Sequence, residues 1–398
     1  MDTPTQTVDL RYGRGHVSLN VPTSATILRS EAAAPIADPE AAVRRALAEP
    51  IGAAPLRQLA AERQPGSVAI TMSDITRPVP NELLITAILE DLNAAGIADD
   101  QVTIIIATGM HRPSTPDERD LMLGKALQQR CEVIDHEADD LDSLTPISDD
   151  PPVSINTRYL EADLKIVTGL IEPHFMAGYS GGRKGICPGL VDLQAVQRFH
   201  GYAVMGDPNT VEGRMDGNPC HEEAMRVARL VGCDFLVNVA INDDRQPTGI
   251  WAGDMVQAHQ VGCAEVARVN SATVEAPAYL VVTCAGGYPL DESFYQTVKG
   301  IVTALPALHE NSTLLILADC REVGSPEYTE LMKRFGEDHH AFLNHIATSG
   351  RTGKDQWQYQ MHCRVLERIG VDNLMLACDR LPLEVQAKLG VTPIVTDD

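Results

Sequence analysis

Two histidines in this sequence follow apolar runs that are predicted to be strands. At the end of a strand, the side chain of a histidine can transfer protons. His111 comes shortly after the apolar run at 102–107, and His174 comes shortly after the run at 164–167. Imidazole titrates near neutrality, so two such histidines can act as an acid and a base. The alternative for each is a structural or surface histidine.

A glycine-rich loop with two cations follows His174. Its glycines are at 178, 181, 182 and 185, and Arg183 and Lys184 stand among them. Glycine permits positive φ and the close approach of a ligand to the backbone, so the loop suits a phosphate or another anion. It is not a Walker loop, because the spacing is wrong and Gly185 replaces the required Ser or Thr. The alternative is a tight surface turn.

Asp74 and Arg77 follow a third apolar run, and they can brace one of the histidines. Their alternative role is in the turn chemistry before Pro78. His200 could ligate a metal, yet it has no Cys or carboxylate partner at ligand spacing, which favours a histidine on a helix face. His221 lacks H-E-x-x-H spacing, which favours a first-turn residue of a helix.

A predicted helix from about residue 291 carries Tyr295, Gln296 and Lys299. Side chains three and four positions apart share a helix face, so this face can bind a carboxylate. Its alternative is a solvated polar stripe.

The elements that must position these residues alternate between strand and helix. Apolar runs predict strands at 68–72, 102–107, 132–134, 164–167 and 234–241, and a hairpin is expected at 8–21. A helix is expected at 81–95, and Thr115 with Glu118 forms a capping box for another. Such alternation predicts a mostly parallel sheet, with ligands outside the carboxyl ends of its strands. Asp74, Arg77, His111 and His174 all fall there.

The chain of 398 residues is long enough for two or three domains. Around 270–277 the composition turns small and polar, and strand–helix alternation then restarts, with helices near 326–347 and 355–369. The sequence therefore predicts an α/β fold of two α/β domains, at 1–272 and 273–398. The sheets should be mostly parallel, with the active site in the cleft between the domains.

Composition excludes several classes of function. The net charge of −23 opposes binding to nucleic acids and anionic membranes. No run approaches a membrane span, and the segment 1–10 lacks the apolar core of a signal peptide. Nine dispersed cysteines without a C-x-x-C pair predict reduced thiols and a cytoplasmic protein. The absence of G-x-G-x-x-G after the first strand argues against a nicotinamide dehydrogenase.

Several long motifs, in order over nearly the whole chain, resemble the lactate racemase family, whose members use a nickel-pincer nucleotide. The matching segments are Asp-Ile-Thr-Arg-Pro-Val-Pro at 74–80, Thr-Gly-Met-His-Arg-Pro-Ser-Thr at 108–115, Glu-Pro-His-Phe-Met-Ala-Gly-Tyr-Ser-Gly-Gly-Arg-Lys at 172–184, His200, Asp-Gly-Asn-Pro-Cys-His-Glu-Glu at 216–223, and Ala-Gly-Gly-Tyr-Pro-Leu-Asp with Tyr-Gln at 285–296.

The resemblance implies roles in holding a cofactor, pyridinium-3-thioamide-5-thiocarboxylic acid mononucleotide with nickel. Lys184 would attach it through a thioamide, and His200 would be the protein ligand to nickel. The remaining residues expected near the cofactor are Thr76, Arg77, Ser180, Gly181, Gly182 and Trp357. The domain at 1–272 would carry this attachment, and cofactor-biosynthesis proteins would be partners during maturation.

The resemblance also implies an isomerase that inverts C2 of a small, lactate-like 2-hydroxy acid by reversible hydride transfer. His111 and His174 would exchange the hydroxyl proton, and Asp74 would orient His111. The residues expected to bind the substrate are Arg77, Tyr295, Gln296 and Lys299, with the domain at 273–398 closing the site. The alternatives are another 2-hydroxy acid (malate, an aromatic acid or a sugar acid) and a non-catalytic nucleotide-binding protein.

Overall fold

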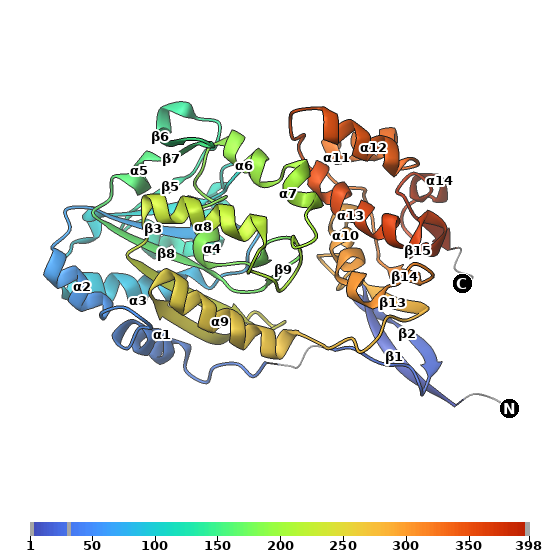
Figure 1. Ribbon diagram of the computed structural model, residues 1–398. Helices are drawn as coiled ribbons and strands as arrows, with labels where there is room; N and C mark the ends of the chain where they lie inside the picture. The colour runs from blue at the N-terminus through green and yellow to red at the C-terminus, as the bar shows by residue number, and fades with distance from the viewer. Residues whose placement is uncertain (1–3, 30–32, 395–398) are drawn as a thin grey trace. The chain divides into compact units, whose positions relative to one another are not determined.

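A computed structural model describes residues 4–29 and 33–394 of the chain, and Figure 1 shows its ribbon. The described residues form two compact units. The larger unit contains residues 33–199 and 209–271, and the smaller unit contains residues 4–29, 200–208 and 272–394. Each unit combines a mostly parallel sheet with helices, which confirms the predicted α/β fold class.

The larger unit is built on a six-stranded sheet with the order β12-β11-β8-β3-β4-β5. Its strands are β3 (Val68–Ser73), β4 (Val102–Ala107), β5 (Glu132–Asp135), β8 (Leu164–Leu170), β11 (Phe235–Ile241) and β12 (Pro247–Gly253). β12 pairs antiparallel with β11, and the other four pairings are parallel. The predicted apolar runs form these strands because side chains on both faces of a helix-covered parallel sheet are buried.

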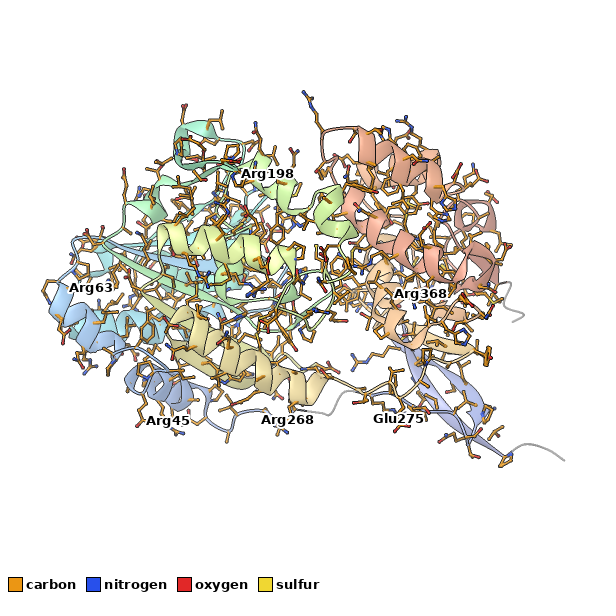
Figure 2. The ribbon with its side chains drawn as sticks, viewed as in Figure 1. Arg45, Arg63, Arg198, Arg268, Glu275 and Arg368 are labelled. Atoms are coloured by element: carbon orange, nitrogen blue, oxygen red, sulfur yellow. The ribbon has the colours of Figure 1, made fainter. Side chains whose placement is uncertain are left out.

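Helices cover this sheet (Figure 1). They are α1 (Pro39–Ala48), α2 (Leu56–Arg63), α3 (Asn81–Ala94), α4 (Pro116–Gln128), α5 (Thr157–Leu160), α6 (Leu193–Phe199), α8 (Pro219–Val231) and α9 (Met255–Asn270). α1 to α4 share one apolar core with the strands, through residues such as Leu47, Leu84 and Leu123. α9 packs on β11 and β12. Figure 2 shows Arg45, Arg63 and Arg268 in the last turns of α1, α2 and α9. A cation there interacts favourably with the negative end of the helix dipole.

The predicted capping box at the start of α4 is confirmed. Glu118 Oε2 accepts a hydrogen bond from the Thr115 N–H at 2.8 Å, and Thr115 Oγ1 accepts one from the Glu118 N–H at 3.3 Å. Shorter elements connect the main ones. They are β6 (Leu144–Asp149) paired with β7 (Pro152–Asn156), β9 (Pro173–His174) paired with β10 (Gly178–Tyr179), and the 3₁₀ turns η1 (Asp99–Gln101), η2 (Leu141–Ser143) and η3 (Gly182–Gly185).

The smaller unit has a four-stranded parallel sheet with the order β13-β14-β15-β16. Its strands are β13 (Leu280–Cys284), β14 (Thr313–Leu317), β15 (Leu374–Ala377) and β16 (Thr392–Ile394), and the predicted hairpin forms as β1 (Thr5–Tyr12) and β2 (Gly15–Pro22). Its helical elements are α7 (Tyr202–Gly206), α10 (Phe294–Thr303), α11 (Pro326–Phe335), α12 (His339–Thr348), α13 (Gln356–Ile369), α14 (Leu383–Gln386), η4 (Leu305–Ala307) and η5 (Val371–Asn373). The region near 326–347 thus contains two helices.

The grouping of the chain differs from the predicted division at 272 in two segments. The hairpin belongs to the smaller unit, because the Gly13 N–H donates to Asp291 Oδ2 at 2.6 Å and the Tyr288 N–H donates to the Gly13 carbonyl at 2.8 Å. Residues 200–208 also belong there, since Gln360 Nε2 donates to the Tyr202 carbonyl at 2.7 Å.

All nine cysteines lie in the described part of the chain and are free thiols there. Within residues 4–29 and 33–394, every helix is too short or too polar to cross a membrane.

Candidate active site

Three parallel strands of the larger unit place Asp74, His111 and the loop with His174 at one edge of the sheet. β3 pairs with both β4 and β8, so the carboxyl ends of the three strands face the same way. Asp74 follows β3 directly, His111 follows β4, and the loop with His174 follows β8. This edge is where open parallel sheets bind their ligands.

Asp74 and His111 form a hydrogen-bonded pair. His111 Nδ1 lies 2.7 Å from Asp74 Oδ2, and Asp74 Oδ1 accepts from the Thr76 hydroxyl at 2.5 Å and the Thr76 N–H at 3.2 Å. Burial alone would raise the pKa of Asp74, but the bonds to His111 and Thr76 and the charge of Arg77 outweigh it and lower that pKa. Asp74 is therefore an ionised acceptor, so the neutral form of His111 carries its proton on Nδ1 and its lone pair on Nε2.

His174 has the opposite arrangement. Its side chain is buried, and its Nδ1 accepts from the backbone N–H of Ala177 at 3.2 Å and of Met176 at 3.4 Å. The ring also stacks on Phe175, with centroids 5.3 Å apart. Because Nδ1 accepts both bonds, the proton of neutral His174 is on Nε2. In their neutral forms, His174 thus presents an N–H at Nε2 and His111 presents a lone pair there.

The glycines of the next loop serve the packing of the protein itself. Gly178, Gly181 and Gly182 have the predicted positive φ, whereas Gly185 does not. A Cβ on Gly178 would lie 2.2 Å from the Arg214 carbonyl oxygen, and one on Gly181 would lie 2.7 Å from Asn238 Oδ1. At both positions protein atoms already occupy the space that a Cβ would take, so a larger residue would disturb the packing of the loop.

Arg183 does not line the loop as a ligand-binding cation, contrary to the expectation. Its side chain is buried, and it donates to the Ala177 carbonyl at 2.7 Å and the Gly181 carbonyl at 3.4 Å. Burial lowers the pKa of Arg183 to about 10, so the guanidinium remains protonated at neutral pH. Its role is to fix the loop around Lys184.

Lys184 lies within η3 and is partly buried. Loss of hydration lowers the pKa of Lys184 well below its ordinary value of 10.5, and the charges of Arg77 and Arg183 lower it further. A lowered pKa increases the neutral fraction of an amine, and the neutral amine is the nucleophile. Lys184 is therefore suited to covalent attachment of an electrophilic group.

Arg77 and Ser180 meet at Glu172, a residue to which the sequence reasoning gave no role. Arg77 Nε lies 3.1 Å from Glu172 Oε1, and the Ser180 hydroxyl donates to the same oxygen at 3.4 Å. Glu172 stands two positions before His174, within a motif that the sequence had singled out.

The candidate residues of the smaller unit lie on or against two of its helices. The rings of His200 and Trp357, both buried, have centroids 4.6 Å apart. On α10, Tyr295 makes an edge contact with Tyr328, and burial raises the pKa of Tyr295, so its phenol stays protonated. The buried Oε1 of Gln296 has no hydrogen-bond partner among the described residues.

Comparison with known proteins decides the family. Residues 12–213, which are 202 of the 398 residues, match the family model described as "Lactate racemase N-terminal domain". Residues 273–385 match the one described as "Lactate racemase C-terminal domain".

The chain belongs to the lactate racemase family. The lactate racemase of Thermoanaerobacterium thermosaccharolyticum is 32% identical over 369 residues, which cover 90% of this chain and 85% of the relative. The lactate racemase of Lactiplantibacillus plantarum is 33% identical over 332 residues, which cover 81% and 77%. These relatives identify the chain as an isomerase of the racemase type, which confirms the predicted enzyme class.

Solved structures agree with this assignment. The lactate racemase apoprotein from T. thermosaccharolyticum matches with a TM-score of 0.88 and 30% identity, over 98% of this chain and 92% of that one. A protein from Thermotoga maritima matches with a TM-score of 0.68 over 92% and 93% of the two chains. Its identity of 16% shows a shared fold alone.

Asn238 is a further residue that the sequence reasoning missed in this family member. It lies on β11, is fully buried, and accepts a hydrogen bond from the Gly182 N–H at 2.9 Å through Oδ1. A lone polar residue in the apolar strand Phe-Leu-Val-Asn-Val-Ala-Ile was the signal that could have found it. Its amide links the sheet to the loop that carries Lys184.

Proposed function

We propose that this enzyme inverts C2 of a small 2-hydroxy carboxylic acid of about the size of lactate. The observation that carries the proposal is the pair of imidazoles with opposite proton roles at one edge of the sheet. His111 offers a lone pair on Nε2, and His174 offers an N–H. The names of the relatives support the substrate class.

In the proposed reaction the two histidines handle the proton of the substrate hydroxyl. His111 Nε2 accepts that proton as the C2–O bond becomes a carbonyl, and the Asp74 carboxylate stabilises the resulting imidazolium. His174 donates a hydrogen bond from Nε2. To take a proton from the opposite enantiomer, His174 must change tautomer, so its Nδ1 must first release the N–H groups of Met176 and Ala177.

The residues fit the nickel-pincer nucleotide that the family resemblance implies. Lys184 has the lowered pKa that attachment through a thioamide needs, and His200 offers an imidazole for nickel against the Trp357 ring. The other residues proposed to hold the group are Thr76, Arg77, Ser180, Gly181 and Gly182. When bound, the nucleotide supplies an electrophilic centre that accepts and returns the C2 hydrogen with its two electrons. Cofactor-biosynthesis proteins would supply it during maturation.

The substrate carboxylate is proposed to meet Arg77, Tyr295, Gln296 and Lys299. Tyr295, Gln296 and Lys299 lie within one turn of α10, and the protonated Tyr295 phenol is a donor. Arg77 is held by Glu172 at 3.1 Å, which fixes the direction of its guanidinium.

The fate of deuterium at C2 tests the proposal. The protein residues exchange only the hydroxyl proton with water, so cofactor-loaded enzyme should racemise C2-deuterated lactate in ordinary water and retain most of the deuterium. Mass spectrometry of the recovered product, alongside chiral chromatography, measures both. Loss of deuterium at the rate of racemisation would indicate proton abstraction and overturn the proposal. Values of kcat/KM for lactate, malate, an aromatic 2-hydroxy acid and a sugar acid identify the preferred substrate.

A further inference from the structure

Three potential metal ligands, none of which was given a role above, converge in the smaller unit. His339 and His340 are the first two residues of α12, and Glu367 lies in the last turn of α13. Glu367 Oε1 is 3.0 Å from His339 Nε2 and 3.3 Å from His340 Nδ1. One ligand atom from each of the three residues lies within 4.8 Å of the others.

We propose that His339, His340 and Glu367 form a second metal site, which binds a divalent transition cation such as Zn²⁺ or Ni²⁺. Two imidazoles and one carboxylate are a common protein ligand set for zinc, and imidazole also suits nickel and copper. Ligand atoms about 2.1 Å from a tetrahedral ion are about 3.4 Å apart, which is close to the two Glu367 distances of 3.0 and 3.3 Å.

The surroundings of the three residues favour a cation. The site is open, because the side chains of His340 and Glu367 are 71% and 49% exposed, so water can complete the coordination. Asp338, the N-cap residue of α12, adds a negative charge beside the pair.

This site is separate from the one proposed for His200. His200 contacts Trp357 in the first turn of α13, whereas Glu367 is ten residues further along the same helix. At 1.5 Å per residue the two positions on α13 are about 15 Å apart. The proposal is therefore independent of the proposed function, and an ion here would tie the start of α12 to the end of α13.

Metal binding to the cofactor-free chain, produced without a polyhistidine tag, tests the site. The His200→Ala variant serves as the background, so that the implied nickel ligand does not contribute. Equilibrium dialysis against Zn²⁺ or Ni²⁺ alone, followed by elemental analysis, should find one ion per chain. His340→Ala and Glu367→Gln should each weaken binding by about tenfold or more. His16→Ala, which removes an exposed histidine on β2, is the matched control and should bind normally.

A thermal measurement gives a second readout. Zn²⁺ should raise the melting temperature of the parent chain and of His16→Ala, because an ion that binds only the folded state stabilises it. His340→Ala, whose side chain is largely exposed, should fold normally but lose this rise. An absence of binding to the parent chain, or equal binding by the parent and both variants, would overturn the proposal.

Discussion

At the scale of single residues, the candidate site depends on which nitrogen of each imidazole carries a proton. The carboxylate of Asp74 places the proton of His111 on Nδ1, and two backbone N–H groups place the proton of His174 on Nε2. The sequence predicted both histidines and the pairing with Asp74. It could not predict the difference between them, because that difference depends on the local backbone around residues 174–177.

Asp74→Asn should disable His111 as a base. The Thr76 N–H and hydroxyl would continue to donate to the amide oxygen, so the amide NH₂ would face His111 Nδ1. Nδ1 would then accept, and the proton would move to Nε2. We expect kcat to fall by about 10³–10⁴-fold, the size of the effect of a comparable tautomer change in a serine protease, with little change in KM. Steady-state kinetics on cofactor-loaded protein measures this, with adduct mass and nickel content verified. A change in KM alone would contradict the assignment.

The amine of Lys184 should make the stability of the cofactor-free chain depend on pH. The pKa of Lys184 in the folded chain lies well below its ordinary value of 10.5. At a pH between the folded-state pKa and 10.5, the amine is therefore protonated in the unfolded chain and neutral in the folded chain. Stability should therefore rise with pH across that window. Lys184→Met removes the titrating group, so it should raise the melting temperature at neutral pH, and its advantage should shrink as the pH approaches 10.5.

Lys125→Met is the matched control for this measurement, because the Lys125 side chain is 80% exposed. Thermal unfolding at a series of pH values compares the two variants with the parent chain. The same pH dependence in the parent chain and in Lys184→Met would show that the amine is not the cause.

At the scale of elements, one strand holds the loop that carries the proposed attachment lysine. Asn238 on β11 accepts from the Gly182 N–H, and Lys184 follows two residues later. Asn238→Leu keeps the approximate volume but leaves that buried N–H unpaired. We expect the free energy of unfolding to fall by about 1–3 kcal/mol.

Two measurements separate this loss from a general weakening of the fold. Denaturant unfolding gives the change in free energy, and hydrogen exchange should accelerate at the Gly182 amide. Asn20→Leu, at an exposed position on β2, should change neither quantity appreciably. If the Gly182 amide exchanged as slowly in Asn238→Leu as in the parent chain, the bond would not hold the loop.

Local sequence patterns predicted most elements but not all of their boundaries. The apolar runs, the hairpin and the capping box at Thr115 depend on neighbours in the chain, and all three predictions are confirmed. The break between α11 and α12 has both a local and a distant cause. Gly336 ends α11, and Asp338 caps the start of α12, so the local signals were present in the sequence. The distant cause could not be predicted: a Cβ on Gly336 would lie 1.8 Å from the Lys388 carbonyl oxygen, a contact fifty-two positions away.

At the scale of the whole molecule, the chain passes between its two units more than once. The hairpin at the start of the chain joins the smaller unit through bonds that span 278 residues, from Gly13 to Asp291, and 367 residues, from Tyr12 to Asp379. A shift in composition shows only where the types of residue change along the chain. Such shifts predicted a division at 272, but they could not show that residues 4–29 and 200–208 group with the later segment.

Removal of residues 1–29 should therefore weaken the smaller unit and spare the larger one. The fully buried Asp291 would lose the Gly13 N–H, and Asp379 would lose the Tyr12 hydroxyl. These bonds and the one from the Tyr288 N–H together suggest a loss of about 3 kcal/mol or more.

The chain has two tryptophans, Trp357 on α13 in the smaller unit and Trp251 on β12 in the larger, so each unit has its own fluorescent reporter. In urea titrations of Trp251→Phe, which leaves Trp357 to report, removal of the segment should move the unfolding midpoint to lower urea. In Trp357→Phe, which leaves Trp251, the midpoint should stay in place. Equal shifts in both would mean that the hairpin supports the whole chain, and an unchanged Trp357 transition would mean that the smaller unit folds without it.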